Sequence, residues 1–341
     1  MTDILGGTAT IDFDIIVQDN EDPIAVSKPV VAVLDSNGNA TILPENSDNG
    51  STDNCGIREF ELSQTSFSKN DLGTISVIFT VWDINDNFET INATVSVIDT
   101  EKPKARAKDI PVELNSSGTV TIAAQDVDDG STDNVAITSY SIDKNTFTCS
   151  DIGENTVTLT VSDASGNTDT ATAIVTVEDK IDPTISCISS TSRNTDPGSC
   201  DYTVQGAEFD PSFEDNCSGA TITNNYNNSS TLAGAVIPEG DPITIKWTVT
   251  DTSGNEDSCS FNVTVIDDEA PVITNCPTPV NSYSVDAGEC DAALSFNATA
   301  TDNCDDNVAI SYSVGGSNIS FPYNFPIGTT TVTVTADDGD S

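Results

Sequence analysis

The sequence predicts an all-β protein built of tandem antiparallel β-sandwich modules. Two observations lead to this fold class: the chain repeats itself at a fixed interval, and apolar residues alternate with polar ones inside each repeat. The segment Gly50–Asn54 returns unchanged at residues 130–134, an offset of 80 residues, and Leu34, Phe67 and Gly73 recur at the same offset. Fixed self-similarity of this kind is typical of an array of like modules.

Proline residues mark the junctions between modules. Each junction proline follows an acidic linker, and the spacings are 80, 80 and 88 residues, at Pro23, Pro103, Pro183 and Pro271. We therefore expect residues 1–20 to be the last strand of a preceding, truncated module. Further modules are expected at 21–100, 101–180, 181–268 and 269–341, the fourth without its last strand.

The alternation of apolar residues identifies the buried faces of the strands. One strand recurs with the same inward face in the first and third modules, as Val77, Phe79 and Val81 and as Ile245, Trp247 and Val249. The pair Asn37–Gly38 tolerates positive φ and predicts an early hairpin. No segment has the pattern of an amphipathic helix. Short strands, frequent turns and the repeat length predict seven-stranded immunoglobulin-like sandwiches, joined into an elongated rod.

The composition excludes several classes of function. The chain carries 55 Asp and Glu against 11 Lys and Arg, a net charge of -44, which disfavours binding to nucleic acid or to an anionic membrane and favours cations. Histidine is absent, which removes imidazole bases and histidine-ligated metal sites. The acids are scattered through loops, so we expect no enzyme activity. No apolar run is long enough for a membrane helix, the first residues lack a signal-peptide pattern, and nine cysteines favour an oxidising compartment.

Acidic residues recur at three places in the modules, and together they predict calcium at each junction. The turn and the loop that carry two of these places are expected at the sandwich end that the linker reaches, so the oxygen ligands that Ca²⁺ prefers would converge there. The alternative is that these residues only cap turns. The candidate ligands are Asp19, Glu21, Asp22, Asp99, Glu101, Asp179, Asp182, Asp267 and Glu269 in the linkers, Asp53, Asp133, Asp215 and Asp302 in Asp-Asn pairs, and Asp83, Asp163 and Asp251 in turns.

The positions of the cysteines suggest disulfides in the third and fourth modules. In the third module we expect Cys187 to pair with Cys200 and Cys217 with Cys259. The fourth module repeats the first of these pairs as Cys276 and Cys290.

Several motifs of the last two modules are similar to a known family. The third carries PTISC, GSCDYTV, EDNCSG and VTDTSGNEDSCSFNVTVIDDEAP, and the fourth carries PVITNCP, GECDAAL, TDNC and FPIGTTTVTVTA. With these motifs the chain resembles the hyalin repeat (HYR) family, an immunoglobulin-like module of extracellular adhesion proteins. The first two modules, with FTCSDIGENTVTLTVSDASGN, resemble the divergent repeats of giant surface adhesins of Bacteroidetes. In those repeats the Cys after Asp-Asn pairs with the FTCSD Cys; here Cys55 faces Lys69 and Cys149 faces Val135, so both thiols are expected to be free.

The resemblance implies a structural spacer of an extracellular cell-surface adhesin or filament, connected with attachment or gliding motility. Its partners would be the neighbouring modules of the same chain. An alternative is a module that binds carbohydrate or a host protein through exposed aromatic residues, for which Trp82 is the candidate. Another is a filament in which the strand Ile11–Val17 completes the fourth module of a neighbouring molecule. The sequence disfavours that filament, because Ile11 stands where a partner for Cys304 would be needed.

Overall fold

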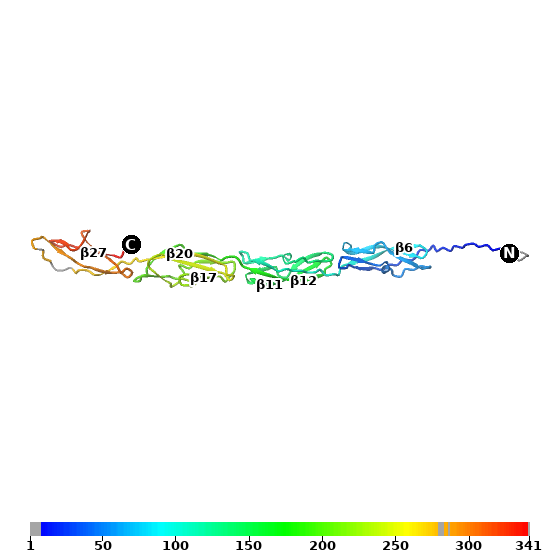
Figure 1. Ribbon diagram of the computed structural model, residues 1–341, viewed down its shortest axis with the longest axis horizontal. Coiled ribbons are helices and arrows are strands. Elements are labelled where there is room, and N and C mark those ends of the chain that lie inside the picture. Colours follow the sequence, from blue (N-terminus) through cyan, green and yellow to red (C-terminus); the bar gives the residue numbers. More distant parts are fainter. Residues whose placement is uncertain (1–7, 279–282, 286, 340–341) are drawn as a thin grey trace. The chain divides into compact units, whose positions relative to one another are not determined.

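The computed structural model describes residues 8–278, 283–285 and 287–339, so residues 1–7 of the expected 1–20 strand lie outside the described chain. The chain separates into two compact units. One unit holds the first two sandwiches, and the other holds the third and fourth together with the turn Leu114–Gly118. Figure 1 shows the first sandwich in blue and cyan and the fourth in orange and red.

The first sandwich has one sheet of order β1-β6-β5-β3 and a second that pairs β2 with β4. All neighbours are antiparallel except β1 and β6, which run parallel. The expected seventh strand is reduced to isolated bridges, from Ile24 to Thr52 and from Ser27 to Asp48. The elements are β1 (Val30–Val33), β2 (Asn39–Thr41), η1 (Pro44–Ser47), β3 (Ile57–Leu62), β4 (Ser66–Ser68), η2 (Lys69–Asp71), β5 (Gly73–Asp83) and β6 (Phe88–Ile98), where η is a 3-10 helix.

The second sandwich repeats this arrangement strand for strand, as the 80-residue offset predicts. Its sheets have the orders β7-β12-β11-β9 and β8-β10, and β7 again runs parallel to β12. The elements are β7 (Ile110–Glu113), β8 (Thr119–Thr121), η3 (Ala124–Asp126), β9 (Ile137–Ile142), β10 (Thr146–Thr148), η4 (Cys149–Asp151), β11 (Gly153–Asp163) and β12 (Thr168–Glu178).

The third sandwich keeps the four-stranded sheet, in the order β14-β20-β19-β17, and divides the facing layer into two pairs, β13-β16 and β15-β18. The longer repeat therefore places its extra residues in the facing layer and its loops. The strands are β13 (Thr184–Ser186), β14 (Thr191–Asn194), β15 (Asp201–Thr203), β16 (Ser212–Glu214), β17 (Thr221–Asn224), β18 (Val236–Pro238), β19 (Ile243–Thr250) and β20 (Glu256–Ile266).

The fourth sandwich is open along one edge. Its sheets pair β21 with β23 and β22 with β26, and β24 lies between β25 and β27. In the other sandwiches the strand equivalent to β27 pairs with a final strand, and within the described residues no strand follows β27. The strands are β21 (Val272–Asn275), β22 (Asp291–Leu294), β23 (Thr299–Thr301), β24 (Ala309–Val314), β25 (Ser317–Ile319), β26 (Tyr323–Pro326) and β27 (Val332–Asp337).

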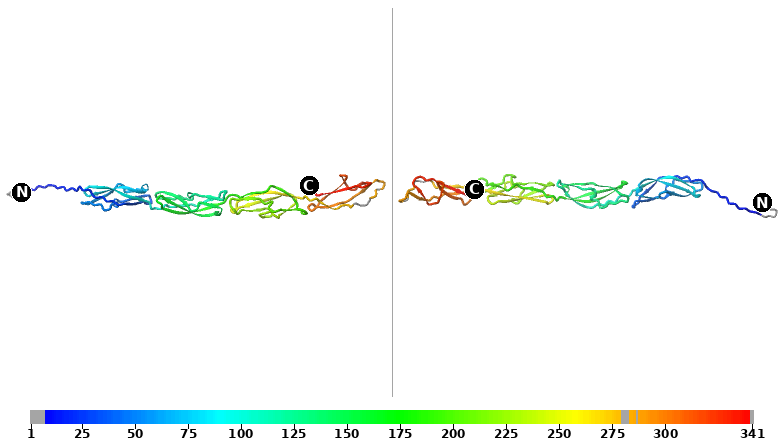
Figure 2. Two further views of the ribbon diagram at one scale, coloured as in Figure 1. Left: turned by 180° about the vertical axis from the view of Figure 1, so that it is seen from behind. Right: turned by 90° about the horizontal axis from the view of Figure 1, so that it is seen from above.

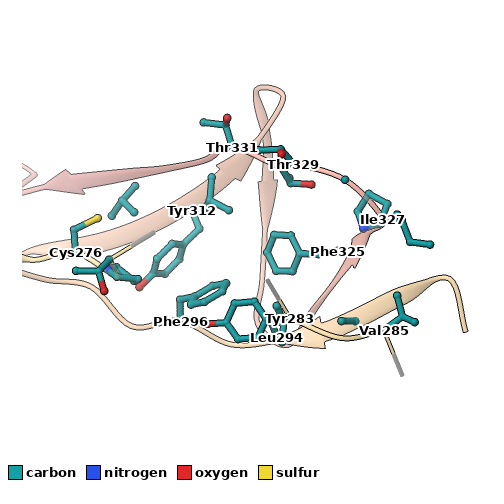
Figure 3. A pocket seen from close by; sticks show the side chains of 18 residues that line it. Cys276, Tyr283, Val285, Leu294, Phe296, Tyr312, Phe325, Ile327, Thr329 and Thr331 are labelled. Atoms are coloured by element: carbon teal, nitrogen blue, oxygen red, sulfur yellow. The ribbon is translucent and has the colours of Figure 1, made fainter. Parts of the chain in front are cut away.

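An apolar groove lies on this open sandwich, with a volume of about 790 Å³. Figure 3 shows Leu294, Phe296, Tyr312 and Phe325 turned toward one another in it. The rings of Phe296 and Phe325 meet edge to face, with centroids 5.9 Å apart. The groove is thus the part of a sandwich core that a final strand covers in the other modules.

Alternate residues of the long central strands face the cores, as the sequence predicts. In β5 Phe79 is fully buried, whereas its neighbour Ile78 is 51% exposed. Trp247 in β19 is also fully buried, and Val95 and Val97 in β6 face the same core as Phe79. Because alternate side chains of a strand point to opposite faces of its sheet, this pattern confirms the all-β fold with tandem sandwich modules.

The early turn forms, but not the hairpin. Gly38 has φ +75°, and its N–H donates to the carbonyl of Asp35 at 2.9 Å. The strands on either side do not pair with each other, because β1 joins the β6 edge while β2 crosses to the other sheet. The predicted hairpin is therefore wrong: pairing with the last strand of the module replaces it.

The described residues before Pro23 follow an extended path outside the first sandwich, seen from two sides in Figure 2. The described residues Ile11–Val17 belong to no strand, and Ile11, Phe13 and Ile15 are 88%, 76% and 76% exposed. In the part of the chain that the structure describes, no helix has the length and apolar character needed to span a bilayer.

The disulfide pairing in the third sandwich differs from the expected one. Cys187 is bonded to Cys259, because the chain after β13 passes directly over β20, and both residues pack against the core of this sandwich. Cys200 is a free thiol at the far end of the sandwich, so the expected pairs Cys187–Cys200 and Cys217–Cys259 are both wrong. Cys217 is nevertheless in disulfide form.

Two other cysteine expectations are also wrong. Cys276 and Cys290 are separate, exposed thiols, since Cys276 directly follows β21 and Cys290 directly precedes β22, and these two strands belong to different sheets. Cys149, expected to be a free core thiol, is in disulfide form. Cys55 is a free thiol, as expected, although it is exposed and not part of the core.

Candidate metal centres at the junctions

Carboxylates from three separate parts of the chain lie together in each of two groups. Asp99 from the linker, Asp133 from the loop before β9 and Asp163 from the end of β11 each offer one oxygen within 4.8 Å of the others. The second group, at the start of the third sandwich, has the same three sources. Its members are Asp179, Asp215 and Asp251.

The linker aspartates divide their oxygens between two roles. Asp99 Oδ1 accepts hydrogen bonds from the N–H of Glu101 at 3.1 Å and from Asn134 Nδ2 at 3.2 Å. Asp99 Oδ2 is buried and has no hydrogen-bond partner among the described residues, and the residue is 6% exposed. The same holds for Oδ2 of Asp179, which is 6% exposed, and of Asp267, which is 2% exposed. A buried carboxylate oxygen without a partner is costly unless a cation meets it.

The Asp-Asn pairs contribute a second set of oxygens to the same two groups. Asp133 Oδ2 accepts hydrogen bonds from the N–H groups of Val135 and Ala136 at 2.8 and 3.0 Å, which fixes the loop. Asp133 Oδ1 and Asn134 Oδ1 are buried, and no hydrogen-bond partner for either lies in the part of the chain that the structure describes. Asp215 repeats the arrangement: its Oδ2 accepts from the N–H of Cys217 at 3.2 Å, and its Oδ1 is buried without a partner.

The turn aspartates cap their turns while they belong to the groups. Asp163 Oδ1 accepts hydrogen bonds from the N–H groups of Ser165 and Asn167, and its Oδ2 accepts from Asn167 Nδ2 at 2.7 Å. The capping role that the sequence left open is therefore present together with the convergence. The two are compatible, because each carboxylate oxygen has more than one lone pair.

The negative charges of the carboxylates within a group repel one another. The pKa of Asp215 is raised, first because burial disfavours the charged carboxylate and then because Asp251 and Asp179 are nearby negative charges. Two hydrogen bonds from backbone N–H groups act in the other direction without cancelling this rise. A bound cation would remove the repulsion and favour the ionised form.

The donor set of the two groups fits calcium. With bonds of about 2.3–2.6 Å, Ca²⁺ holds oxygen ligands up to about 5 Å apart. The ligand atoms of each group lie within 4.8 Å of one another, which is inside that span, and all three side chains of each group are hard oxygen donors. Two further groups each replace the third carboxylate with a thiol, which is a poorer calcium ligand. These are Asp19, Asp53 and Cys55, and Asp267, Asp302 and Cys304.

Six of the sequence-predicted ligands lie outside these groups. Asp83 is buried but does not join Asp19 and Asp53. Glu269 accepts a hydrogen bond from the N–H of Gly198 at 2.8 Å instead. The other four are exposed linker residues: Glu21, Asp22, Glu101 and Asp182.

Sequence reasoning did not assign roles to the asparagines that end the turns. Asn167 Nδ2 approaches the carbonyl oxygen of Asp99 at 3.4 Å, and Asn255 Nδ2 donates to that of Asp179 at 3.1 Å. Asn87 makes the equivalent contact with Asp19 at 3.3 Å. These side chains tie the linker backbone to the turn beside each group. Their recurrence as the last residue of DINDN, DASGN and DTSGN is the signal that could have found them.

Comparison with solved structures finds extracellular regions made of cadherin domains. Human Desmocollin-1 is 11% identical, with a TM-score of 0.26, and the match covers 99% of this chain and 83% of that one. Mouse Cadherin-23 EC22–24 is also 11% identical, with a TM-score of 0.30, covering 73% of this chain and 100% of that one.

Comparison with protein families and curated proteins gives a more specific result. Hyalin from Strongylocentrotus purpuratus is 30% identical over 189 residues, a match covering 54% of this chain and 15% of that protein. The chain therefore spans less than a sixth of the length of this relative. The HYR domain family matches residues 178–265, which cover all of the third sandwich except the last residue of β20 and include the group of Asp179, Asp215 and Asp251. This protein thus contains an HYR domain.

Proposed function

We propose that the chain is a structural spacer of an extracellular adhesin, in which calcium bound at the junctions holds consecutive sandwiches together. The observation that carries the proposal is the set of buried carboxylate oxygens without partners, on Asp99 and Asp133 in one group and on Asp179 and Asp215 in the other. An uncompensated negative cluster disfavours the folded state, whereas a divalent cation turns the same oxygens into a stabilising contact.

The first of these groups is placed where it would fix a junction. Asp99 comes from the linker, while Asp133 and Asp163 come from the second sandwich. Asn134, next to Asp133, donates from Nδ2 to the carbonyl oxygen of Asp35, in the turn after β1 of the first sandwich, at 2.9 Å. Calcium at this point would join linker and second sandwich and would stiffen a loop that already contacts the first sandwich.

The proposed location and the absence of catalysis follow from the same features. The HYR match and the disulfide Cys187–Cys259 both favour the cell exterior. The acids of the groups hold turns and linkers instead of lining a substrate cavity, so we propose a mechanical role and no enzyme activity. Within such a protein, the partners of each sandwich are its neighbours along the chain.

Calcium is expected to raise the melting temperature of chelator-treated protein and to give a saturable heat of binding in calorimetric titration. Extracellular calcium modules bind with dissociation constants of about 10⁻⁴–10⁻³ M. At a hundredfold excess over the dissociation constant, one site would stabilise the fold by about 2.7 kcal/mol. If calcium changes neither the heat signal nor the melting temperature, the proposal is wrong.

A matched pair of variants separates the proposed ligands from acids in general. Asp179→Asn keeps the size and the hydrogen bonds of the linker residue but removes its charge, so one calcium site should be lost. Asp182→Asn removes the same charge three residues away from an exposed position outside the group. Equal loss of calcium binding in both variants would point to diffuse charge and contradict the assigned ligands.

A ligand-binding role has less support. The ring of Trp82, the candidate platform, packs on Phe88 with centroids 4.5 Å apart and lies 5.4 Å from the guanidinium carbon of Arg58. Its Nε1 donates to Glu61 at 3.1 Å. These contacts occupy the ring that a sugar would need, so we do not propose carbohydrate binding.

Self-assembly through a donated strand is the second candidate function, and the groove of the fourth sandwich favours it. Among the described residues β27 has a neighbouring strand on one side only, and a strand with alternate apolar residues would fit its other edge and the groove beside it. Residues Ile11, Phe13 and Ile15 alternate in this way and are exposed. We propose a second copy of this chain as the occupant, with Ile11–Val17 laid along β27.

Light scattering at increasing concentration tests this assembly. The expected result is a mass that rises with concentration for the unaltered chain and stays monomeric for Phe13→Asp with Ile15→Asp. The control Asp14→Asn changes the other face of the segment and should assemble like the unaltered chain. A monomeric mass at every concentration would leave the groove to some other occupant and dismiss the filament.

A further inference from the structure

Two thiols from consecutive sandwiches face each other in the C-terminal unit. Cys200 lies at the end of the turn before β15 of the third sandwich, and Cys304 lies in the loop before β24 of the fourth. Cys200 Sγ is hydrogen-bonded to the carbonyl oxygen of Asn303, and Cys304 Sγ lies 3.6 Å from that of Ser199.

Contacts that do not involve the thiols hold both segments in place. Asn303 Nδ2 donates to the carbonyl oxygen of Ser199 at 3.3 Å, directly across the junction. On the other side, the N–H of Gly198 donates to Glu269 in the linker at 2.8 Å. The approach of Cys200 to Cys304 is therefore set by the packing of the two sandwiches and the linker.

In the N-terminal unit, the residue that follows the Asp-Asn pair also contacts the preceding sandwich. There the residue is Val135, which packs against the core cluster of the first sandwich. Cys304 follows Asp302-Asn303 as Val135 follows Asp133-Asn134. The same loop position therefore reaches the previous sandwich in both units, with an apolar side chain in one and a thiol in the other.

We propose that Cys200 and Cys304 form a disulfide that covalently joins the third and fourth sandwiches. The co-reactant is a small-molecule disulfide of the oxidising compartment. One protein thiolate, having released its proton, attacks this disulfide, forms a mixed disulfide and displaces one thiolate of the small molecule. The second protein thiolate attacks the mixed disulfide, forms the Cys200–Cys304 bond and displaces the other. Two protein thiols are thereby oxidised, and one disulfide is reduced to two thiols.

This cross-link would use the thiol of the group of Asp267, Asp302 and Cys304, one of the two groups that have only two carboxylates. Since a disulfide does not depend on calcium, the junction with the weaker set of oxygen ligands would be held by a covalent bond instead. The inference does not rest on the proposed calcium sites, and its test is made in the presence of a chelator.

The test is a disulfide map of the full chain, incubated with oxidised glutathione and chelator, then alkylated and digested without reduction. We expect a peptide pair joined through Cys200 and Cys304, two hydrogens lighter than the sum of its reduced parts. The Cys187–Cys259 pair is the internal standard for a folded, oxidised third sandwich. Cys55, exposed and far along the chain, should be alkylated in the monomeric fraction.

Two variants make the result specific. Cys276→Ser removes another exposed thiol of the fourth sandwich and should leave the Cys200–Cys304 pair unchanged. Cys200→Ser should leave Cys304 alkylated. If Cys200 and Cys304 are both alkylated in the unaltered chain while Cys187–Cys259 is intact, the proposal is overturned, and this outcome needs no variant to fold. Preferential pairing of Cys304 with Cys276 or Cys290 would overturn it as well.

Discussion

Replacing both Cys187 and Cys259 with alanine is expected to lower the free energy of unfolding of the third sandwich by about 4 kcal/mol. The two residues are 72 positions apart, so their bond closes nearly the whole module and strongly restricts its unfolded chain. Urea unfolding followed by the fluorescence of Trp247, which is fully buried in this sandwich, measures the effect. Trp82 is first changed to phenylalanine so that the signal reports one module.

Cys276→Ala is the control for the loss of a cysteine as such, because this residue is an exposed thiol of the fourth sandwich. It should change the stability of the third sandwich by less than about 0.5 kcal/mol. A stability loss below about 1 kcal/mol for the double variant, well under the usual range for native disulfides, would contradict the role given to this bond.

The second large effect is expected for Phe209→Ala, which should cost the third sandwich about 3–5 kcal/mol. Phe209 is fully buried, and its ring lies between those of Tyr202 and Phe261, with centroids 6.3 and 5.9 Å away. Removing the ring leaves a cavity in the centre of the core. The same urea titration with Trp247 as reporter gives the measurement.

Phe213→Ala is the matched control, with the same change of side chain four residues further along. Phe213 lies in β16 and is 38% exposed, so its removal opens no enclosed cavity and should cost less than half as much. Equal losses for the two variants would mean that the core is not centred on Phe209.

The long central strands could be predicted from the sequence, whereas the facing layer could not. Phe79 and Trp247 stand in segments where polar and apolar residues alternate strictly, and that pattern has one structural interpretation. Phe209 stands in AEFDPSFED, where Phe213 has equal apolar character and no period distinguishes them. Which ring enters the core depends on how the chain turns before β16, and that is decided by tertiary packing.

The acidic groups, too, could be predicted from the sequence only in part. Recurrence at three places in successive modules predicts that linker, loop and turn acids converge, and the structure brings Asp99, Asp133 and Asp163 together. Recurrence in the sequence could not tell which of the two linker acids, Asp99 or Glu101, would join the group. Asp99 Oδ1 accepts the N–H of Glu101, and this local turn directs Asp99 inward while Glu101 stays exposed.

The cysteine pairs were beyond sequence reasoning for a further reason. Cys187 and Cys200 are close in sequence, but β14 lies between them and runs parallel to β20, so the two thiols end far apart in the sandwich. Nearness along the chain suggested the wrong partner. The topology of a parallel pair, which separates sequence neighbours, has no signature in cysteine spacing.

The parallel pair of the first sandwich also decides how that module would respond to a pull on its two ends. β1 near the entry and β6 at the exit lie side by side over four residue pairs, from Val30 with Val95 to Val33 with Ile98. Since the strands point the same way, opposite forces on the ends would slide them lengthwise. All the hydrogen bonds between the two strands would then carry load at once, instead of breaking one after another.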